Sequence, residues 1–145
     1  MRRPAVPAGV RVYVVAPLGG RLERLEVALA AIEADRADAP ASVRTVLLGG
    51  LVDGPDAPAL VLRAMKLAAD EDVAVLVGPA EQALGAEAQH WPGGVPASVE
   101  HWLARLPREG AIGDYGFANG RLMARGRVVA GEVLVLEGDR RRALL

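Results

Sequence analysis

The stretch that decides the fold reads Arg11-Val12-Tyr13-Val14-Val15-Ala16-Pro17-Leu18-Gly19-Gly20-Arg21-Leu22-Glu23-Arg24-Leu25. Its first part is an apolar run rich in β-branched residues, which predicts a buried strand of a parallel sheet. Pro17 and Gly19-Gly20 predict a turn, and from Arg21 onward apolar residues recur at helical spacing. In α/β proteins such a turn lies at the carboxyl end of a strand, where ligands usually bind. This turn contains no acidic, His, Cys or hydroxyl side chain, so it has the position of a site without its chemistry.

The same strand–turn–helix pattern occurs twice more along the chain. Residues 43–48 predict a second strand that ends at Gly49-Gly50, and residues 73–77 predict a third that ends at Gly78-Pro79. Asp56 is placed to cap a helix after the second strand, and residues 81–88 favour a helix after the third. Three such alternations predict a right-handed βαβαβ sheet with helices on its faces.

The C-terminal third has a different pattern. Ser98 is placed to cap a helix with one apolar stripe that ends at Pro107. Asn119-Gly120 is a strong signal of a type I′ hairpin, and residues 140–145 predict an edge strand. We therefore predict a single α/β domain over residues 1–145, with a mainly parallel sheet, flanking helices and a C-terminal β-hairpin region. Residues 1–9 are expected to form a loose arm.

The amino-acid composition argues against several classes of function. The 145 residues include 17 Lys+Arg and 18 Asp+Glu, and the net charge of -1 argues against binding to nucleic acid or to an anionic membrane. The absence of Cys excludes disulfides and thiolate chemistry. His90 and His101 are too few and too far apart in sequence to suggest a metal site. No apolar run reaches the roughly 18 residues of a membrane span, and the N-terminus does not have the pattern of a signal peptide, so we expect a cytoplasmic protein.

Short motifs follow the three predicted strands, and they read Ala16-Pro17-Leu18-Gly19-Gly20-Arg21, Gly49-Gly50-Leu51-Val52-Asp53-Gly54-Pro55-Asp56 and Gly78-Pro79-Ala80-Glu81. Their order resembles the calcineurin-like metallophosphoesterases, especially the bacterial serine/threonine protein phosphatase and symmetrical dinucleoside-tetraphosphatase branch. In that family the motifs read Gly-Asp-x-His-Gly-Arg, Gly-Asp-x-x-Asp-Arg-Gly-Pro-Asp-Ser and Gly-Asn-His-Glu. The resemblance covers residues 10–107, including Trp91-Pro92-Gly93-Gly94 and the following helix, and it implies an abbreviated metallophosphoesterase-like fold.

The resemblance also implies that the reactive residues of the family are replaced. Where the family has Asp, His, Asp, Asn and His, this chain has, in that order, Pro17, Gly19, Gly50, Pro79 and Ala80. Asp53 and Glu81 are kept, but the family's Asp at the first of these positions supports the catalytic His that is missing here. Two-metal hydrolysis needs several side-chain donors around both ions. We therefore predict no catalytic residues, no metal site and no cofactor.

A domain of this kind is expected to act as a non-catalytic protein-interaction or structural module, with another protein or a second copy of itself as partner. One alternative is a metal-dependent phosphoesterase with atypical or partner-supplied ligands. A further alternative is a sensor of a small anionic ligand, which Gly19, Gly20 and Arg21 would hold at a helix N-terminus. The same three residues also suit a tight turn with no ligand.

Three other features each have a functional and a structural interpretation. Either Asp53, Asp56 and Glu81 form a residual cation site, or Asp56 and Glu81 lie at helix N-termini and Asp53 forms hydrogen bonds to loop amides. Trp91, in a loop rich in Pro and Gly, is either an exposed interface residue or packs beneath that loop. The run from Arg140 to Arg142 is either an anion-binding patch or a soluble edge strand.

Overall fold

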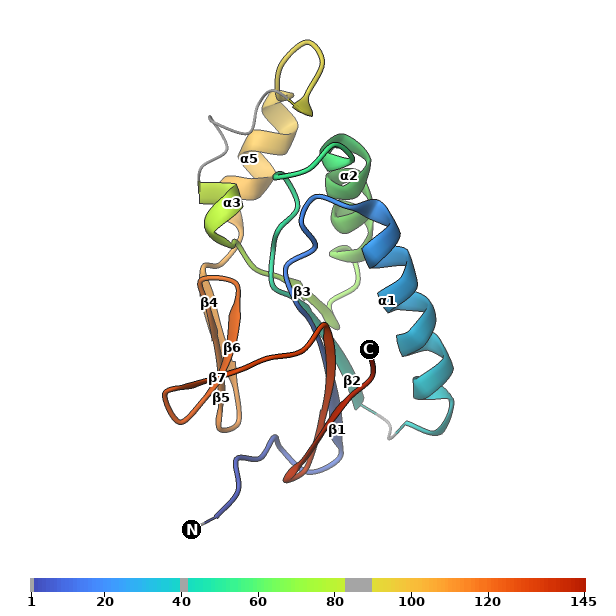
Figure 1. Ribbon diagram of the computed structural model, residues 1–145, viewed down its shortest axis with the longest axis vertical. Coiled ribbons are helices and arrows are strands. Elements are labelled where there is room, and N and C mark those ends of the chain that lie inside the picture. The colour runs from blue at the N-terminus through green and yellow to red at the C-terminus, as the bar shows by residue number, and fades with distance from the viewer. Residues whose placement is uncertain (1, 40–41, 83–89) are drawn as a thin grey trace.

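The computed structural model describes residues 2–39, 42–82 and 90–145, which form three layers (Figure 1). A five-stranded sheet is the middle layer. Helices α1 (Leu22–Asp35) and α2 (Ala57–Leu67) cover one face of this sheet, and a four-stranded sheet covers the other face. The fold is therefore mixed α/β, which confirms the predicted class at this level.

The five-stranded sheet has the order β3-β2-β1-β8-β9. Strands β1 (Val10–Val15), β2 (Ser42–Leu47) and β3 (Val73–Val75) are parallel. Strand β8 (Val133–Glu137) pairs antiparallel with β1, and β9 (Arg140–Ala143) pairs antiparallel with β8. The predicted mainly parallel sheet is therefore only partly found. The last two strands form a hairpin, which needs no crossover connection and so runs antiparallel.

Helices α1 and α2 each bury one apolar face because their apolar residues recur every three or four positions. The buried residues of the two helices are Leu25, Ala28, Ile32, Ala57, Leu60, Val61 and Ala64. They form one cluster with Tyr13 and Val15, which point to this side of β1. The helix predicted to begin near Arg21 is confirmed, and it is followed by a short 3-10 helix, Arg36–Asp38.

The four-stranded sheet is antiparallel and has the order β4-β5-β6-β7. Its strands are β4 (Glu109–Ile112), β5 (Tyr115–Ala118), β6 (Arg121–Ala124) and β7 (Arg127–Val129). Asn119 and Gly120 join β5 to β6 with φ angles of 53° and 74°. Positive φ at both central residues is the mark of a type I′ turn, so the predicted hairpin is confirmed.

The second face of the central sheet packs against this antiparallel sheet rather than against helices. Successive residues of a strand point to opposite faces, so Val12 and Val14 lie opposite Tyr13 and Val15. They form a second core cluster with Phe117 and Leu122 of β5 and β6. The prediction of helices on both faces is therefore wrong.

Two further helices lie beyond the carboxyl ends of the parallel strands: α3 (Pro79–Gln82) and α5 (Ala97–Arg105) (Figure 1). Pro96 stands at the N-cap of α5, so the predicted cap by Ser98 is wrong, although Val99 and Leu103 are buried as the apolar stripe predicts. Of the helix predicted over residues 81–88, the part from residue 83 onward lies outside the described residues. None of the helices in the described ranges is long and apolar enough to cross a bilayer.

The N-terminal segment, for which the sequence predicted a loose arm over residues 1–9, contacts the rest of the domain at Ala5 and Val6. The backbone N–H of Val6 donates to the carbonyl of Gly138 at 3.0 Å. The N–H of Ala5 donates to Asp114 Oδ2 at 3.0 Å, and the N–H of Asp114 donates back to the carbonyl of Ala5 at 2.9 Å. Val6 is buried in the second core cluster, and burying this apolar side chain is the physical reason that the arm docks.

Candidate functional site

The loops that follow the three parallel strands meet at one end of the sheet. The N–H of Leu48 donates to the carbonyl of Val15 at 3.0 Å, which keeps the ends of β1 and β2 in register. Beyond them, the N–H of Leu18 donates to the carbonyl of Gly49 at 3.2 Å, and the N–H of Gly20 donates to the carbonyl of Gly50 at 2.7 Å. The first and second loops are therefore joined directly, backbone to backbone.

Glu81 joins the second loop to the third. One carboxylate oxygen accepts a hydrogen bond from the N–H of Leu51 at 2.6 Å, and the other accepts one from the N–H of Gly78 at 3.1 Å. The residue is only 6% exposed. Burial raises the pKa of Glu81, and the nearby charge of Asp53 acts in the same direction, while the two backbone hydrogen bonds oppose this shift. The Glu81 carboxylate therefore links the second loop to the third through hydrogen bonds.

Gly50 lies where a side chain would collide with the first loop. Its φ of +71° is in the left-handed region, and a Cβ atom built on it would stand 2.5 Å from the backbone nitrogen of Leu18. The same atom would stand 2.9 Å from the Cβ of Pro17. A Cβ on Gly20 would likewise overlap the backbone of Gly54. The space between the first two loops is therefore filled by backbone.

The turn between β5 and β6 reaches the same place from the other sheet. A Cβ on Gly120 would lie 3.2 Å from Pro17 Cγ, 3.4 Å from Pro79 Cδ and 3.5 Å from the carbonyl oxygen of Leu48. Gly120 therefore has all three loops as close neighbours, and Pro17, Gly50 and Pro79 converge. The sequence predicted the hairpin but contained no signal that its turn would lie on these strand ends.

The other positions carried over from the resemblance surround this point. Gly19 lies near Arg24, because a Cβ on it would stand 3.3 Å from Arg24 Nη1. Asp53 is exposed, and Ala80 is half-buried against the first core cluster. Among the residues that the structure describes, no group of three or more His, Cys, Asp or Glu side chains is arranged to hold a metal ion. Backbone amides and the Glu81 carboxylate form hydrogen bonds at the convergence, and the charge of Asp53 is near enough to act on Glu81.

Three backbone donors at the N-terminus of α1, proposed above as an anion site, are engaged within the protein. The N–H of Leu22 donates to Asp56 Oδ2 at 3.2 Å, the N–H of Arg21 donates to Leu18, and the N–H of Gly20 donates to Gly50. Asp56 stands at the N-cap position of α2, as predicted, but its side chain makes no hydrogen bond to the amides of α2 and instead caps α1. A protein carboxylate already has the place that a phosphate would take.

Trp91 is buried, which favours packing beneath its loop over the alternative of an exposed interface residue. Its side chain packs in the first core cluster and the residue is only 6% exposed. Its indole Nε1 has no hydrogen-bond acceptor among the described residues. The loop of Pro and Gly therefore places an apolar anchor into the core, as the structural interpretation of this residue predicted.

A polar cluster that the sequence did not suggest lies at the opposite end of the sheet. Arg11 belongs to the apolar strand β1 and is only 6% exposed, although its side chain is charged. Its guanidinium donates to Glu137 at 3.0 Å, to Asp38 at 3.1 Å and to Asp35 at 3.2 Å. Asp35 also accepts from the Tyr13 hydroxyl at 2.7 Å and forms an ion pair with Arg142 at 2.8 Å.

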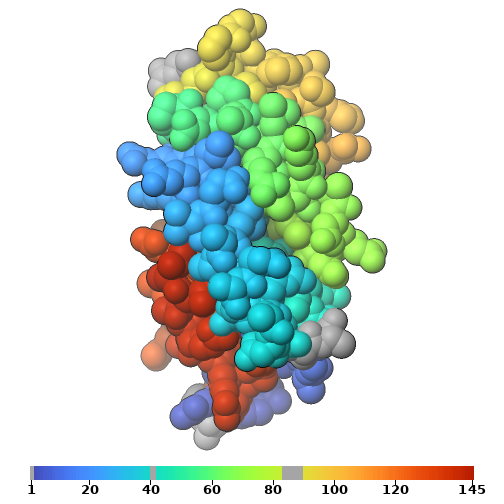
Figure 2. All heavy atoms as spheres, turned by 90° about the vertical axis from the view of Figure 1, so that its right-hand side faces the viewer, coloured from blue at the N-terminus to red at the C-terminus, as the bar shows by residue number. Residues whose placement is uncertain are grey.

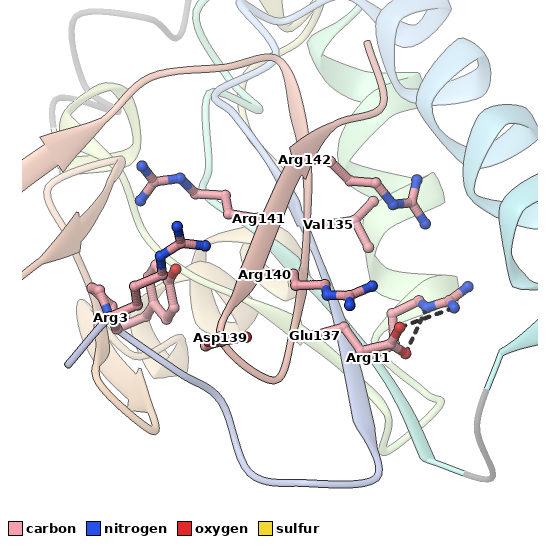
Figure 3. Close-up of a pocket in the computed structure, with 10 residues that line it drawn as sticks. Arg3, Arg11, Val135, Glu137, Asp139, Arg140, Arg141 and Arg142 are labelled. Carbon is pink, nitrogen blue, oxygen red and sulfur yellow. Dashed lines mark hydrogen bonds and ion pairs between the residues drawn. The ribbon is translucent and has the colours of Figure 1, made fainter.

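This cluster shifts the titration of its members. The hydrogen bond from Arg142 holds the pKa of Asp35 below its usual value, and burial alone would raise it. The hydrogen bond to Glu137 raises the pKa of Arg11, and burial raises the pKa of Tyr13. Beside the cluster lies an open hollow, and five of its ten lining residues are arginines; Figure 3 shows it in close-up.

Comparison with known proteins adds no relative, because no family model, no curated protein and no solved structure matches this chain. The function must therefore be argued from the geometry.

Proposed function

We propose that the chain is a non-catalytic, abbreviated metallophosphoesterase-like domain that acts as a structural or protein-interaction module. The observation that carries this proposal is the convergence of Pro17, Gly50 and Pro79 at the carboxyl ends of three parallel strands. These are the positions at which the resemblance places three metal ligands of the family. Their meeting at one place supports the alignment, which had been made from sequence motifs alone.

The packing at this place supports the loss of catalysis independently of the missing ligands. Hydrolysis on a two-metal centre needs room for two ions and for the phosphoryl group between them. Here the first and second loops are bonded to each other, and a Cβ at Gly50 would already overlap Leu18. Glu81 has both carboxylate oxygens engaged with backbone amides. The loops stabilise one another, which is the expected behaviour of a scaffold.

The test is metal binding and hydrolysis by the full chain. Isothermal titration with Mn²⁺ is expected to give no saturable heat, and p-nitrophenyl phosphate with Mn²⁺ is expected to give no turnover above buffer. If the chain had a specific Mn²⁺ site, Mn²⁺ at about 100 times the Kd of that site would stabilise the folded state by about 2.7 kcal/mol. The midpoint of thermal unfolding is therefore a second measurement, and we expect Mn²⁺ to leave it unchanged. Saturable binding of two ions, or turnover that depends on Mn²⁺, would overturn the proposal and favour the enzyme.

A further inference from the structure

Strand β9 is an unpaired edge of the central sheet. It stands last in the strand order, and all four of its residues are exposed. The C-terminal residues that include it lie on the surface beside α1 (Figure 2). An edge strand presents backbone N–H and C=O groups that have no partner within the sheet, and these can pair with another chain. The backbone of β9 is therefore available for an added strand.

The side chains of β9 make both faces of this edge basic. Because side chains alternate along a strand, Arg140 and Arg142 point to one side and Arg141 points to the other (Figure 3). Arg3 of the N-terminal arm lies on the same side as Arg141, and Arg11 lies on the side of Arg140 and Arg142 (Figure 3). Positively charged side chains therefore lie on both faces of the sheet at this edge.

Part of this charge is not neutralised within the protein. An open hollow of about 660 Å³ along β9 is lined by five arginines and two acids, together with Pro4, Tyr115 and Val135. Arg11 and Arg142 form ion pairs with Asp35, and Arg11 forms another with Glu137. Arg3, Arg140 and Arg141 form no ion pair with any residue in the described ranges. The surplus of positive charge favours an anionic partner.

We propose that β9 binds an extended acidic peptide segment of another protein as an added strand. The main chain of the peptide pairs with the free edge of β9, and its successive acidic side chains alternate between the two faces. They meet Arg140 on one side, and Arg141 with Arg3 on the other. This proposal gives the kind of partner for the interaction role proposed above, and it rests on that role. It involves the end of the sheet opposite the convergent loops.

Two other occupants fit the geometry less well. A second copy that paired through its own β9 would bring Arg140 to Arg142 of both chains together, and like charges opposite one another destabilise a strand pair. A single small anion is best held by arginines that converge on one point. Here Arg140 and Arg141 lie on opposite sides of the strand (Figure 3). An extended partner reaches both sides at once.

The test uses the full chain and a fluorescein-labelled peptide with the sequence Val-Thr-Val-Glu-Glu-Glu-Val-Thr-Val. Fluorescence anisotropy is expected to show saturable binding that weakens with salt. An analogue with N-methylated central amides keeps the charges but loses main-chain donors, and its affinity is expected to be at least about tenfold lower. Amide hydrogen exchange at residues 140–143 is expected to slow when the unmodified peptide binds.

Charge-reversal variants locate the site. The double variant Arg140→Glu with Arg141→Glu is expected to weaken peptide binding by at least about tenfold, since both attractive contacts become repulsive. The matched control Arg108→Glu, at an exposed position outside the hollow, is expected to change affinity less than about twofold. All three residues are exposed, so circular dichroism should show an unchanged fold.

The outcomes separate this inference from the proposed function. Equal binding of the N-methylated peptide, or no slowing of exchange at residues 140–143, would refute strand addition and leave a general polyanion patch. Dimerisation through β9 in sedimentation, without peptide binding, would refute it in favour of a second copy. No binding of any anion would also refute it. None of these results alters the Mn²⁺ and hydrolysis measurements, which test the convergent loops alone.

Discussion

Replacing Gly50 by alanine tests the claim that the convergent loops are packed backbone to backbone. Two effects act at this position. The φ of +71° places any residue with a Cβ atom in the left-handed region, which costs about 1–2 kcal/mol. The added Cβ would also stand 2.5 Å from the nitrogen of Leu18, and relieving such an overlap costs about 1–3 kcal/mol.

Together these effects amount to about 2–5 kcal/mol, a large fraction of the 5–15 kcal/mol by which a domain is typically stable. Urea unfolding followed by circular dichroism measures the change directly. In thermal unfolding, about 3 °C per kcal/mol for a chain of this size gives a decrease of about 6–15 °C in the midpoint. The slope of the urea transition is expected to stay constant, because the variant changes packing and not the extent of unfolding.

Gly9→Ala is the matched control. Gly9 has a similar φ of +79°, but a Cβ on it would have no atom within 4 Å. Its substitution therefore has the backbone cost alone, about 1–2 kcal/mol. If the two variants lose the same stability, or if Gly50→Ala loses less, the loops have room for side chains and the argument that the space is filled fails.

Three further substitutions test the remaining polar contacts. Glu81→Gln leaves the N–H of Leu51 or Gly78 without its acceptor and is expected to cost about 1–3 kcal/mol in urea unfolding. Burial raises the pKa of Glu81, so the folded state binds the Glu81 proton more tightly than the unfolded state does. The free energy of unfolding therefore falls as pH rises from the ordinary pKa of 4.5 through the raised pKa, and Glu81→Gln is expected to lack this pH dependence. Asp35→Asn is expected to cost about 1.5–3 kcal/mol near neutral pH by weakening the contacts to Arg142 and Tyr13. The pKa of Asp35 is lowered, so its contribution to the free energy of unfolding is present above the ordinary pKa of 3.8 and is lost as pH falls through the lowered value. If wild type loses stability with falling pH no more steeply than Asp35→Asn does, this prediction is contradicted. Asp56→Ala removes the cap of α1 and is expected to cost about 0.5–2 kcal/mol, whereas Asp53→Ala in the same loop should cost less than about 0.5 kcal/mol by thermal unfolding.

The elements predicted correctly are those encoded by local patterns. The apolar run in β1, the helical spacing of Leu25 and Ile32, and the Asn119-Gly120 turn each specify their structure within a few neighbouring residues. The predictions that were wrong concern which partner an element meets. Asp56 has the sequence position of a cap for α2, yet it accepts from Leu22, which is far away along the chain.

The candidate site was predicted in the same uneven way. Motif positions indicated that Pro17, Gly50 and Pro79 would meet, and the structure places Pro17 and Pro79 beside Gly120 and Gly50 against Pro17. One interpretation of the sequence gave Glu81 a structural role at a helix N-terminus, but its bridge between Leu51 and Gly78 was not predicted, because these two hydrogen bonds depend on the folded path of the second and third loops. Trp91 gave an ambiguous signal, since a large aromatic residue in a loop is equally compatible with burial and with exposure until the packing is known.

The amino-acid sequence by itself determined the first three strands, helix α1, the Asn119-Gly120 turn and the lack of donor side chains at Pro17, Gly50 and Pro79, because these are local properties of residue type and spacing. Tertiary structure alone decided that an antiparallel sheet covers one face and that Arg11 is buried among carboxylates, whereas the basic edge strand β9 was already predicted from residues 140–145. The physical reason is that burial and ion pairing depend on contacts between residues far apart in the chain. Those contacts form only when the three layers pack together.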